Sequence, residues 1–261
     1  MFCLMCWAGC LRLSAQVEQS PHELDIYLCI GQSNMAGRAT LTPEVMDTLQ
    51  HVYLFNDKNV FEKAVNPMNR YSTIRKDMSM QRLGPAYAFG KEMHEQTGRE
   101  IGLVVNARGG SSINSWLKGS ADGYYEQALA RVREAMEHGR LRAVIWHQGE
   151  ADCAHPEAYK EKLLRLMTDL RKDLNMPELP VVVGQISRWN WTKRSEGTVP
   201  FNKMIETAAL WLPCSACVSS KDLMPYKDET DPHFDTASQL LLGKRYAEKV
   251  LELLQATCED R

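Results

Sequence analysis

The stretch DIYLCIGQSNM, residues 25–35, joins an apolar run to a small polar cluster. Residues 26–30 are large and apolar without alternation, which is typical of a strand buried on both faces. The cluster that follows contains Gly31, Ser33 and Asn34, and such residues are common in ordinary turns. The same cluster also suits a nucleophilic serine, because open α/β sheets bind their ligands at the carboxyl ends of strands. The rest of the sequence has to decide between a turn and a site.

Apolar runs alternate with helical patterns along the whole chain. Strands are expected at residues 26–30, 51–55, 101–106, 143–146 and 181–185, and helices at residues 84–97, 121–137, 156–174, 201–212 and 235–254. Gly98 suits the end of the first of these helices, and Asp235 is a candidate N-cap of the last. This βαβα order predicts a parallel sheet between two layers of helices. Residues 56–82 are polar and weakly periodic, which predicts a long surface excursion near the site.

The bulk composition is that of an ordinary globular protein. The chain has 261 residues, of which 44% are hydrophobic and 25% charged, and its formal net charge is -2. No clustered basic face indicates nucleic-acid binding. No Gly-rich phosphate-binding pattern occurs, so we expect no nucleotide cofactor. Because no linker-like stretch divides the chain, we expect one domain over residues 16–261.

Residues 1–15 have the character of an export signal. They are apolar and end in small residues, which predicts a secretory signal segment and a secreted or periplasmic protein. Residues 7–10 (Trp-Ala-Gly-Cys) also resemble a bacterial lipoprotein box. The alternative is a start codon that lies within or just before a longer signal. The run is too short to span a membrane, which takes ~20 apolar residues.

The eight cysteines do not form a metal-binding pattern. Three of them, Cys3, Cys6 and Cys10, lie in the expected signal segment. Cys214 and Cys217 form a CxxC pair, but no second pair completes a zinc site, so we expect no metal. The pair is either two cysteines at a strand edge or a small disulfide of an exported protein.

Polar clusters follow several of the predicted strands. Residues 106–112 and 147–152 come directly after strands, and residues 231–235 precede the last helix. Since such segments converge at one edge of a doubly wound sheet, Ser33 is better explained as a nucleophile than as a turn residue. A serine needs a neighbouring base, and His233 is the best candidate because imidazole titrates near neutral pH. His147, at a strand end, is either a substrate contact or a buried structural histidine.

A tetrahedral intermediate of acyl transfer requires hydrogen-bond donors for its oxyanion. The candidates are the backbone N–H groups of Ser33, Gly109 and Gly110 and the side-chain amide of Gln148. The two glycines are alternatively explained by a tight turn. Met35 occupies the place of the second glycine of a GxSxG motif, so the nucleophile elbow of α/β-hydrolases is not indicated.

The sequence resembles the SGNH hydrolases, and within them the carbohydrate esterases that include sialate O-acetylesterase-like and acetylxylan-esterase-like proteins. The resemblance rests on IGQSNMAG (30–37), GGSS (109–112) with Trp116, WHQGEAD (146–152) and DPHF (231–234). It implies a flavodoxin-like three-layer α/β/α sandwich with a central parallel sheet, no cofactor, and removal of O-acetyl groups from sugars. It further implies Ser33 as nucleophile, His233 as base, and an oxyanion hole from Ser33, Gly109, Gly110 and Gln148.

Several further residues of these motifs are expected to support the catalytic groups from behind or to contact the substrate. They are Gln32, Asn34, Arg108, Trp116, His147 and Glu150. Arg38, Trp189 and Trp191 are further candidates for a sugar-facing wall, with ordinary packing or a solvated surface as the alternative. Arg38 and Arg108 lie near the motifs. Since arginine binds carboxylates well, an anionic sugar is one of the substrates that the sequence leaves open.

One position departs from the family pattern. The acid of the triad usually stands three residues before the histidine, and that position is Thr230 here. Asp231, two residues before, orients His233 in the first alternative. In the second, a backbone carbonyl replaces the acid and leaves a Ser–His dyad. In the third, Asp228, Glu229 or Glu150 reaches the imidazole; Glu150 alternatively bonds neighbouring groups or caps its loop.

Two other functions remain open at the level of the sequence. A carbohydrate-binding protein that has lost turnover would keep the pocket, and the displaced aspartate is the feature that favours it. An esterase or thioesterase for lipid acyl chains would need a long apolar channel, whereas the residues near the motifs are Trp, Tyr and Arg. The sequence carries no signal for the oligomeric state.

Overall fold

The structure is a computed structural model, and it describes residues 23–189, 191 and 197–259. In this part of the chain seven strands form one sheet in the order β3-β2-β4-β1-β5-β6-β7. The strands are β1 (Leu24–Gly31), β2 (Val52–Phe55), β3 (Phe61–Lys63), β4 (Ile101–Ala107), β5 (Gly139–His147), β6 (Val181–Gly184) and β7 (Ser215–Val218). All neighbouring strands pair in parallel except β2 and β3, which are antiparallel.

Strand β1 lies at the centre of the sheet, between β4 and β5. Its alternate residues enter two different cores: Ile26, Leu28 and Ile30 pack on one face, and Tyr27 and Cys29 pack on the other. Burial on both faces explains the continuous apolar run. The chain builds β2 and β4 on one side of β1 and then β5, β6 and β7 on the other, so β1 marks the switch point where such sheets place their sites.

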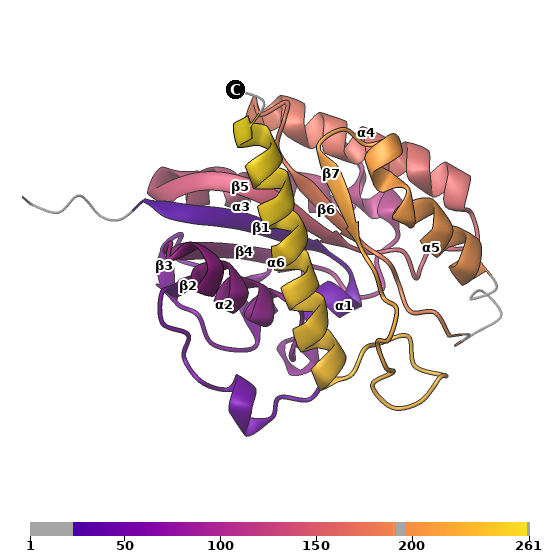
Figure 1. Cartoon of the computed structure of the whole chain (residues 1–261), viewed down its shortest axis with the longest axis horizontal. Helices are drawn as coiled ribbons and strands as arrows, with labels where there is room; N and C mark the ends of the chain where they lie inside the picture. The colour runs from indigo at the N-terminus through magenta and orange to yellow at the C-terminus, as the bar shows by residue number, and fades with distance from the viewer. Residues whose placement is uncertain (1–22, 190, 192–196, 260–261) are drawn as a thin grey trace, which may run out of the picture.

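Helices cover both faces of the sheet (Figure 1). Helices α2 (Ala86–Thr97) and α6 (Thr236–Glu259) pack on one face, and α3 (Tyr124–Ala135), α4 (Pro156–Leu174) and α5 (Thr198–Glu206) pack on the other. Short helical turns connect these elements: α1 (Ser33–Ala36), η1 (Pro43–Val45), η2 (Met68–Tyr71), η3 (Met78–Met80), η4 (Ile113–Trp116), η5 (Met136–His138) and η7 (Ala208–Leu210). The predicted three-layer α/β/α fold is therefore confirmed, and two edge strands are added to the five expected ones: β3, which is antiparallel, and β7, which is parallel.

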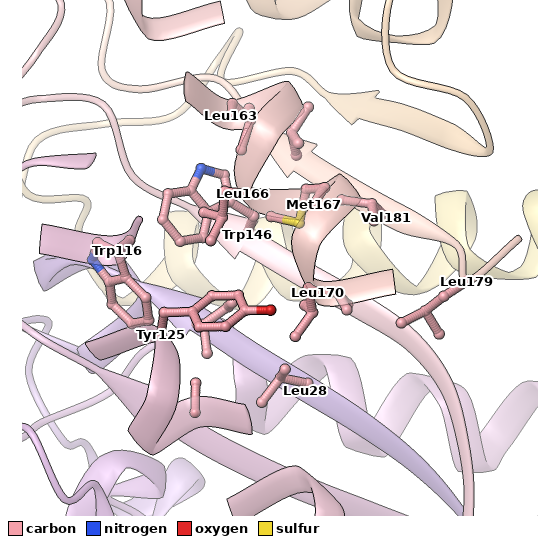
Figure 2. Packing of buried hydrophobic residues seen from close by; sticks show 14 of the residues in the cluster. Leu28, Trp116, Tyr125, Trp146, Leu163, Leu166, Met167, Leu170, Leu179 and Val181 are labelled. Atoms are coloured by element: carbon pink, nitrogen blue, oxygen red, sulfur yellow. The ribbon is translucent and has the colours of Figure 1, made fainter. Parts of the chain in front are cut away.

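Two indole rings anchor the core between the sheet and helices α3 and α4. Trp116 and Trp146 are fully buried and meet edge to face, with 5.3 Å between their centroids. Figure 2 shows them together with Tyr125 and Leu166, which come from the two helices. Trp146 is the second-last residue of β5, so this core supports the loop that follows the strand.

Helix ends agree with the sequence where capping residues are present. Gly98 closes α2 with φ of +66°, and the Ser238 N–H donates to Asp235 Oδ1 (2.8 Å) at the start of α6. The helix expected at residues 201–212 instead begins at Thr198 and ends at Glu206, followed by η7. The helix expected at residues 121–137 is shorter at both ends.

The expected excursion at residues 56–82 contains strand β3 and two 3-10 turns. It reaches the carboxyl end of β4, where Asn69 Nδ2 donates to the Ala107 carbonyl and Asn69 Oδ1 accepts from the Ala107 N–H (3.1 and 2.9 Å). Cys214 directly precedes edge strand β7 and Cys217 lies within it, and both are free thiols. The prediction of two cysteines at a strand edge is therefore confirmed, and the alternative of a small disulfide is wrong.

The expected signal segment at residues 1–15 lies outside the described residues, as do residues 16–22. Two interpretations therefore stay predictions: that residues 16–261 form one domain, and that the protein is exported by a signal segment. Among the helices of the described chain, none combines the length and the apolar character that crossing a membrane requires.

Candidate active site

A sharp turn after β1 places Ser33 at the carboxyl edge of the sheet. Gly31 has φ of +139°, and a Cβ there would lie 2.1 Å from the His147 carbonyl oxygen, so only glycine is accommodated. The Gln32 N–H donates to that same carbonyl (2.9 Å), which ties the turn to β5. Ser33 then begins α1, and the N–H groups of a first helical turn have no partner within the helix.

Ser33, His233 and Asp231 form one hydrogen-bonded chain. His233 Nε2 lies 2.9 Å from Ser33 Oγ, and His233 Nδ1 lies 2.6 Å from Asp231 Oδ1. The same Asp231 oxygen also accepts the His233 backbone N–H (2.9 Å), which is how an acid two residues away reaches the ring. The structure thus places the first of the alternative acids, Asp231, against the imidazole.

The other carboxylates considered for this role lie elsewhere. Asp228 is exposed and accepts from the backbone and the hydroxyl of Thr230 (2.8 and 2.5 Å). Glu150 bonds Asn34 through Oε1 (2.6 Å) rather than His233.

Asn34 connects the nucleophile turn to the histidine loop. Its Nδ2 donates to Glu150 Oε1 and to the Pro232 carbonyl (2.6 and 3.1 Å). Its Oδ1 accepts the Phe234 N–H and Gln239 Nε2 (3.2 and 3.1 Å). Asn34 therefore holds the chain on both sides of His233, a role that the sequence motif does not specify.

Trp189 supports the same loop from the other side. Its Nε1 donates to the Asp231 carbonyl (2.7 Å), and its ring meets Phe234 edge to face with 5.7 Å between centroids. Trp191 is partly buried against the core that contains α4 and α5. For both residues the structure shows packing contacts, and Trp189 in addition binds the main chain of Asp231.

The surroundings of His233 favour the neutral imidazole. Burial lowers the pKa of His233, the charge of Asp231 acts in the opposite direction, and the nearby Arg38 cation lowers it further. The net direction is below the ordinary value of 6.5. His233 is therefore available as a base at neutral pH.

The loop that follows β4 brings a glycine pair close to Ser33 through Gly109. A Cβ added at Gly109 would lie 3.6 Å from Ser33 Cβ, and Gly110 has φ of +72°, which favours glycine. Within the described residues, the N–H groups of Gly109 and Gly110 donate no hydrogen bond. These two N–H groups and that of Ser33 are therefore donors without a partner in this part of the chain.

Gln148 does not have a free donor. Its side chain is fully buried, and its Nε2 faces Gln32 Oε1 (3.0 Å), the Ser111 carbonyl (3.0 Å) and Asp152 Oδ2 (2.6 Å). An amide nitrogen carries two hydrogens, and three internal acceptors already compete for them. The structure therefore contradicts the prediction that Gln148 donates directly to the oxyanion.

Trp116 and His147 are both completely buried, which contradicts the substrate-contact alternative for each. Trp116 Nε1 donates to Ser111 Oγ (2.9 Å) and so supports the loop of the two glycines. His147 Nδ1 lies 2.8 Å from the Tyr246 hydroxyl, and its ring packs edge to face on Phe234. Burial lowers the pKa of His147 to about 3, so this histidine is neutral and structural.

Glu150 is a buried acid beneath the site. Its Oε1 accepts from Asn34, and its Oε2 has no partner. Burial, with a smaller contribution from the charge of Asp152, raises the pKa of Glu150 to about 7, although the hydrogen bond from Asn34 acts in the opposite direction. Glu150 therefore supports the catalytic loop through Asn34 and titrates near neutral pH.

Two arginines approach the glycine loop without a carboxylate partner among the described residues. Arg38 Nη1 donates to the carbonyls of Gly37 and Met80 (2.7 and 2.8 Å), and its Nη2 would lie 2.3 Å from a Cβ added at Gly109. Arg108 Nη1 donates to the Ile74 carbonyl (3.0 Å). Arg38 thus brings a positive charge close to Ser33, whereas Arg108 braces the excursion. Within residues 23–189, 191 and 197–259, no three His, Cys, Asp or Glu side chains are grouped to hold a metal ion.

The sequence matches a family of known proteins over residues 23–252, a range that contains every residue of this site. The family is described as carbohydrate esterase, sialic acid-specific acetylesterase. The chain belongs to this family. It is thus an esterase that hydrolyses acetyl esters of carbohydrates, and the resemblance to the SGNH carbohydrate esterases is confirmed.

Individual relatives agree with this assignment. The esterase is 32% identical over 250 residues to a probable carbohydrate esterase of Arabidopsis thaliana, covering 87% of this chain and 90% of the relative. The solved structure of the Arabidopsis protein has a TM-score of 0.76, at 27% identity and 89% and 99% coverage.

Two more distant structures share the fold of the esterase. NanS matches with a TM-score of 0.65 at 16% identity, over 91% of this chain and 99% of NanS. A carbohydrate acetylesterase from Xanthomonas citri matches with a TM-score of 0.63 at 17% identity, over 89% of this chain and 57% of that chain.

Proposed function

We propose that the esterase removes O-acetyl groups from carbohydrates through an acyl-enzyme on Ser33, with His233 as the general base and Asp231 as the acid that orients it. The supporting observation is the hydrogen-bonded chain Ser33 Oγ, His233 Nε2, His233 Nδ1, Asp231 Oδ1, with links of 2.9 and 2.6 Å. Asp231 holds the proton of the imidazole on Nδ1, which leaves the Nε2 lone pair facing the serine hydroxyl.

The first half-reaction transfers the acetyl group to the enzyme. Ser33 Oγ attacks the acetyl carbonyl carbon while its proton moves to His233 Nε2. The carbonyl oxygen becomes an oxyanion, which the N–H groups of Ser33, Gly109 and Gly110 stabilise. The tetrahedral intermediate then expels the sugar oxygen, which takes the proton from His233 and leaves as an alcohol.

The second half-reaction restores the serine. His233 removes a proton from a water molecule, which attacks the acetyl carbon on Ser33. The same backbone donors stabilise the second oxyanion. Collapse returns the proton from His233 to Ser33 Oγ and releases acetate, so the enzyme ends in its starting state.

The charges around the site favour an anionic sugar. Arg38 has one nitrogen anchored on main-chain carbonyls and no carboxylate partner in the described chain. Two further cations lie nearby. Lys76 Nζ lies 3.6 Å from the position of a Cβ added at Gly110, and Arg82 is close enough to Arg38 to repel its charge. A partly buried guanidinium without an acid is costly unless a ligand supplies the anion. We therefore include an acidic sugar such as a sialic acid in the proposal, in preference to neutral xylan.

Acetate release from a panel of acetylated sugars tests this function. The wild type is expected to release acetate from O-acetylated sialic acid faster than from acetylated xylan, and Ser33→Ala is expected to release it from neither. Arg38→Gln is expected to raise KM for the acidic sugar but not for a neutral aryl acetate. Binding of glycans without any deacetylation would instead favour the non-catalytic carbohydrate-binding alternative. Faster turnover of long-chain acyl esters than of acetates would favour the lipid esterase.

A further inference from the structure

Asp152 lies behind the glycine loop and accepts three hydrogen bonds at once. Its Oδ1 accepts from Ser112 Oγ (2.6 Å), and its Oδ2 accepts from the Ile113 N–H (2.8 Å) and from Gln148 Nε2 (2.6 Å). Asp152 follows β5, whereas Ser112 and Ile113 follow β4. The carboxylate therefore joins the loops of two strands that flank β1 from either side.

Gln148 extends this connection to the residue before the nucleophile. Its Nε2 also faces the Ser111 carbonyl and Gln32 Oε1, each at 3.0 Å. Gln32 Oε1 in addition lies 3.4 Å from the Gly149 nitrogen, which donates to it. With its oxygen held in this way, the Gln32 amide nitrogen donates no hydrogen bond within the described residues. It is a further free donor directly before Ser33.

The orientation of the Gln148 amide has an energetic cost. Its Oε1 is buried and has no partner, and an unpaired buried acceptor loses its hydrogen bonds to water without replacement. The flipped amide would be worse, because its oxygen would then face three other oxygen atoms. Asp152 supplies the shortest of the three contacts to Nε2, so it contributes strongly to this orientation.

We propose that Asp152 is a positioning residue for the proposed acyl-transfer reaction, on which this inference rests. Through Ser112, Ile113 and Gln148 it holds residues 109–113 so that the glycine N–H groups point at the oxyanion, and it fixes the Gln32 amide beside Ser33. Asp152 does not touch the reacting atoms. Its effect is confined to how well the donors are placed, and a displacement of about 1 Å in such a site costs on the order of a hundredfold in rate.

The test compares Asp152→Ala, Asp152→Asn and the matched control Asp173→Ala. Asp173 is also a carboxylate that joins two segments, since it accepts from Lys118 Nζ and the Tyr125 hydroxyl (2.7 Å each for its Oδ2), but it lies on α4 and contacts none of the site residues. We measure kcat and KM for an aryl acetate, the melting temperature, and inhibition by an alkylboronic acid that forms a tetrahedral adduct on a serine.

Asp152→Ala is expected to lower kcat roughly ten- to a hundredfold with KM nearly unchanged. The inhibition constant of the boronic acid should rise by a similar factor, because its adduct uses the same donors. Asp152→Asn should recover most of the activity, since its amide oxygen accepts from Gln148 and Ile113 while its amide nitrogen donates to Ser112 Oγ. Asp173→Ala should keep kcat even where it lowers the melting temperature.

An unchanged kcat in Asp152→Ala would overturn the inference, as would a loss that appears only in KM or that Asp173→Ala reproduces at equal melting temperature. If Asp152→Ala does not fold, the double variant Ser112→Ala/Gln148→Ala removes both side-chain bonds to Asp152, and wild-type kcat in that variant is equally contradictory. An active Ser33→Ala would instead refute the proposed function itself. An inactive Ser33→Ala with a fully active Asp152→Ala would refute this inference alone.

Discussion

Ser33 Oγ and His233 Nε2 lie 2.9 Å apart although 200 residues separate them along the chain. Ser33 follows the central strand, and His233 lies in the loop before the last helix. Asn34, the neighbour of Ser33, binds the main chain at Pro232 and Phe234, on both sides of the histidine. The turn that contains Ser33 therefore also carries the residue that positions His233, the base of the proposed mechanism.

Asp231 should be required for turnover. Asp231→Ala is expected to lower kcat for an aryl acetate roughly 10³- to 10⁴-fold, because the imidazole loses the partner that sets its tautomer and stabilises its charge. Asp228→Ala is the matched control, since Asp228 lies three residues away and its side chain bonds only Thr230, while its backbone carbonyl, which accepts the Asp231 N–H, is kept in the variant. Near wild-type kcat in Asp231→Ala would indicate a Ser–His dyad.

The pH profile should show an inflection below that of an ordinary imidazole. The base must be neutral, so kcat/KM is expected to fall as the pH drops through the pKa of His233, which burial and Arg38 place below 6.5. Arg38→Gln removes a repelling cation and should move the inflection upward. A profile that still rises well above pH 6.5, with chemistry rate-limiting, would contradict this environment for His233.

Glu150 should make folding stability depend on pH. Its pKa is raised from 4.5 to about 7, so the folded protein binds a proton in a range where the unfolded chain has lost it. Stability is then fully present at acid pH and falls as the pH rises from about 4.5 to about 7, by up to about 3 kcal/mol.

Denaturant unfolding of wild type and Glu150→Gln at about pH 5 and pH 8 measures this effect. The glutamine mimics the protonated acid and keeps an oxygen for Asn34, so the variant should gain stability relative to the wild type at the higher pH. It should also keep kcat within a few-fold. The same stability difference at both pH values would show that Glu150 does not titrate in this range, and a large loss of kcat would give Glu150 a direct catalytic role.

Gly110, which has a left-handed backbone conformation, should be required for activity as well as for stability. Gly110 and Gly98 have φ of +72° and +66°, and Gly98 lies at the far end of α2 with open space around it. Alanine at either position should cost about 1 kcal/mol of stability. Gly110→Ala alone should lower kcat, because it moves the donor N–H. Equal kcat in the two variants would remove Gly110 from the oxyanion hole.

The fold was largely predictable because its strands and helices carry strong local patterns. The continuous apolar run of β1 and the one-sided apolar face of α4 each indicate a single structure. Strand β3 escaped prediction because it has three residues, all of them partly or fully exposed. It forms only through pairing with β2, which no local pattern reveals.

The site was predictable in its motifs but not in its internal contacts. Ser33, His233 and the two glycines stand out by residue type and place. The roles of Trp116 and Gln148 could not be read in this way, because an indole or amide in a polar motif faces either the substrate or the interior. Whether Asp231 reaches the imidazole depends on the path of two peptide units around Pro232, which the spacing of residues leaves open.

The most direct measurement of the central claim is to locate the acetyl group on the enzyme during turnover. The wild type is mixed with excess aryl acetate, quenched in acid in the steady state, digested and examined by peptide mass spectrometry. We expect one added acetyl group on the peptide that contains Ser33, assigned to Ser33 by fragmentation and absent from Ser33→Ala. An acetyl group on another residue that forms and decays at the rate of turnover, with Ser33 unmodified, would contradict the account.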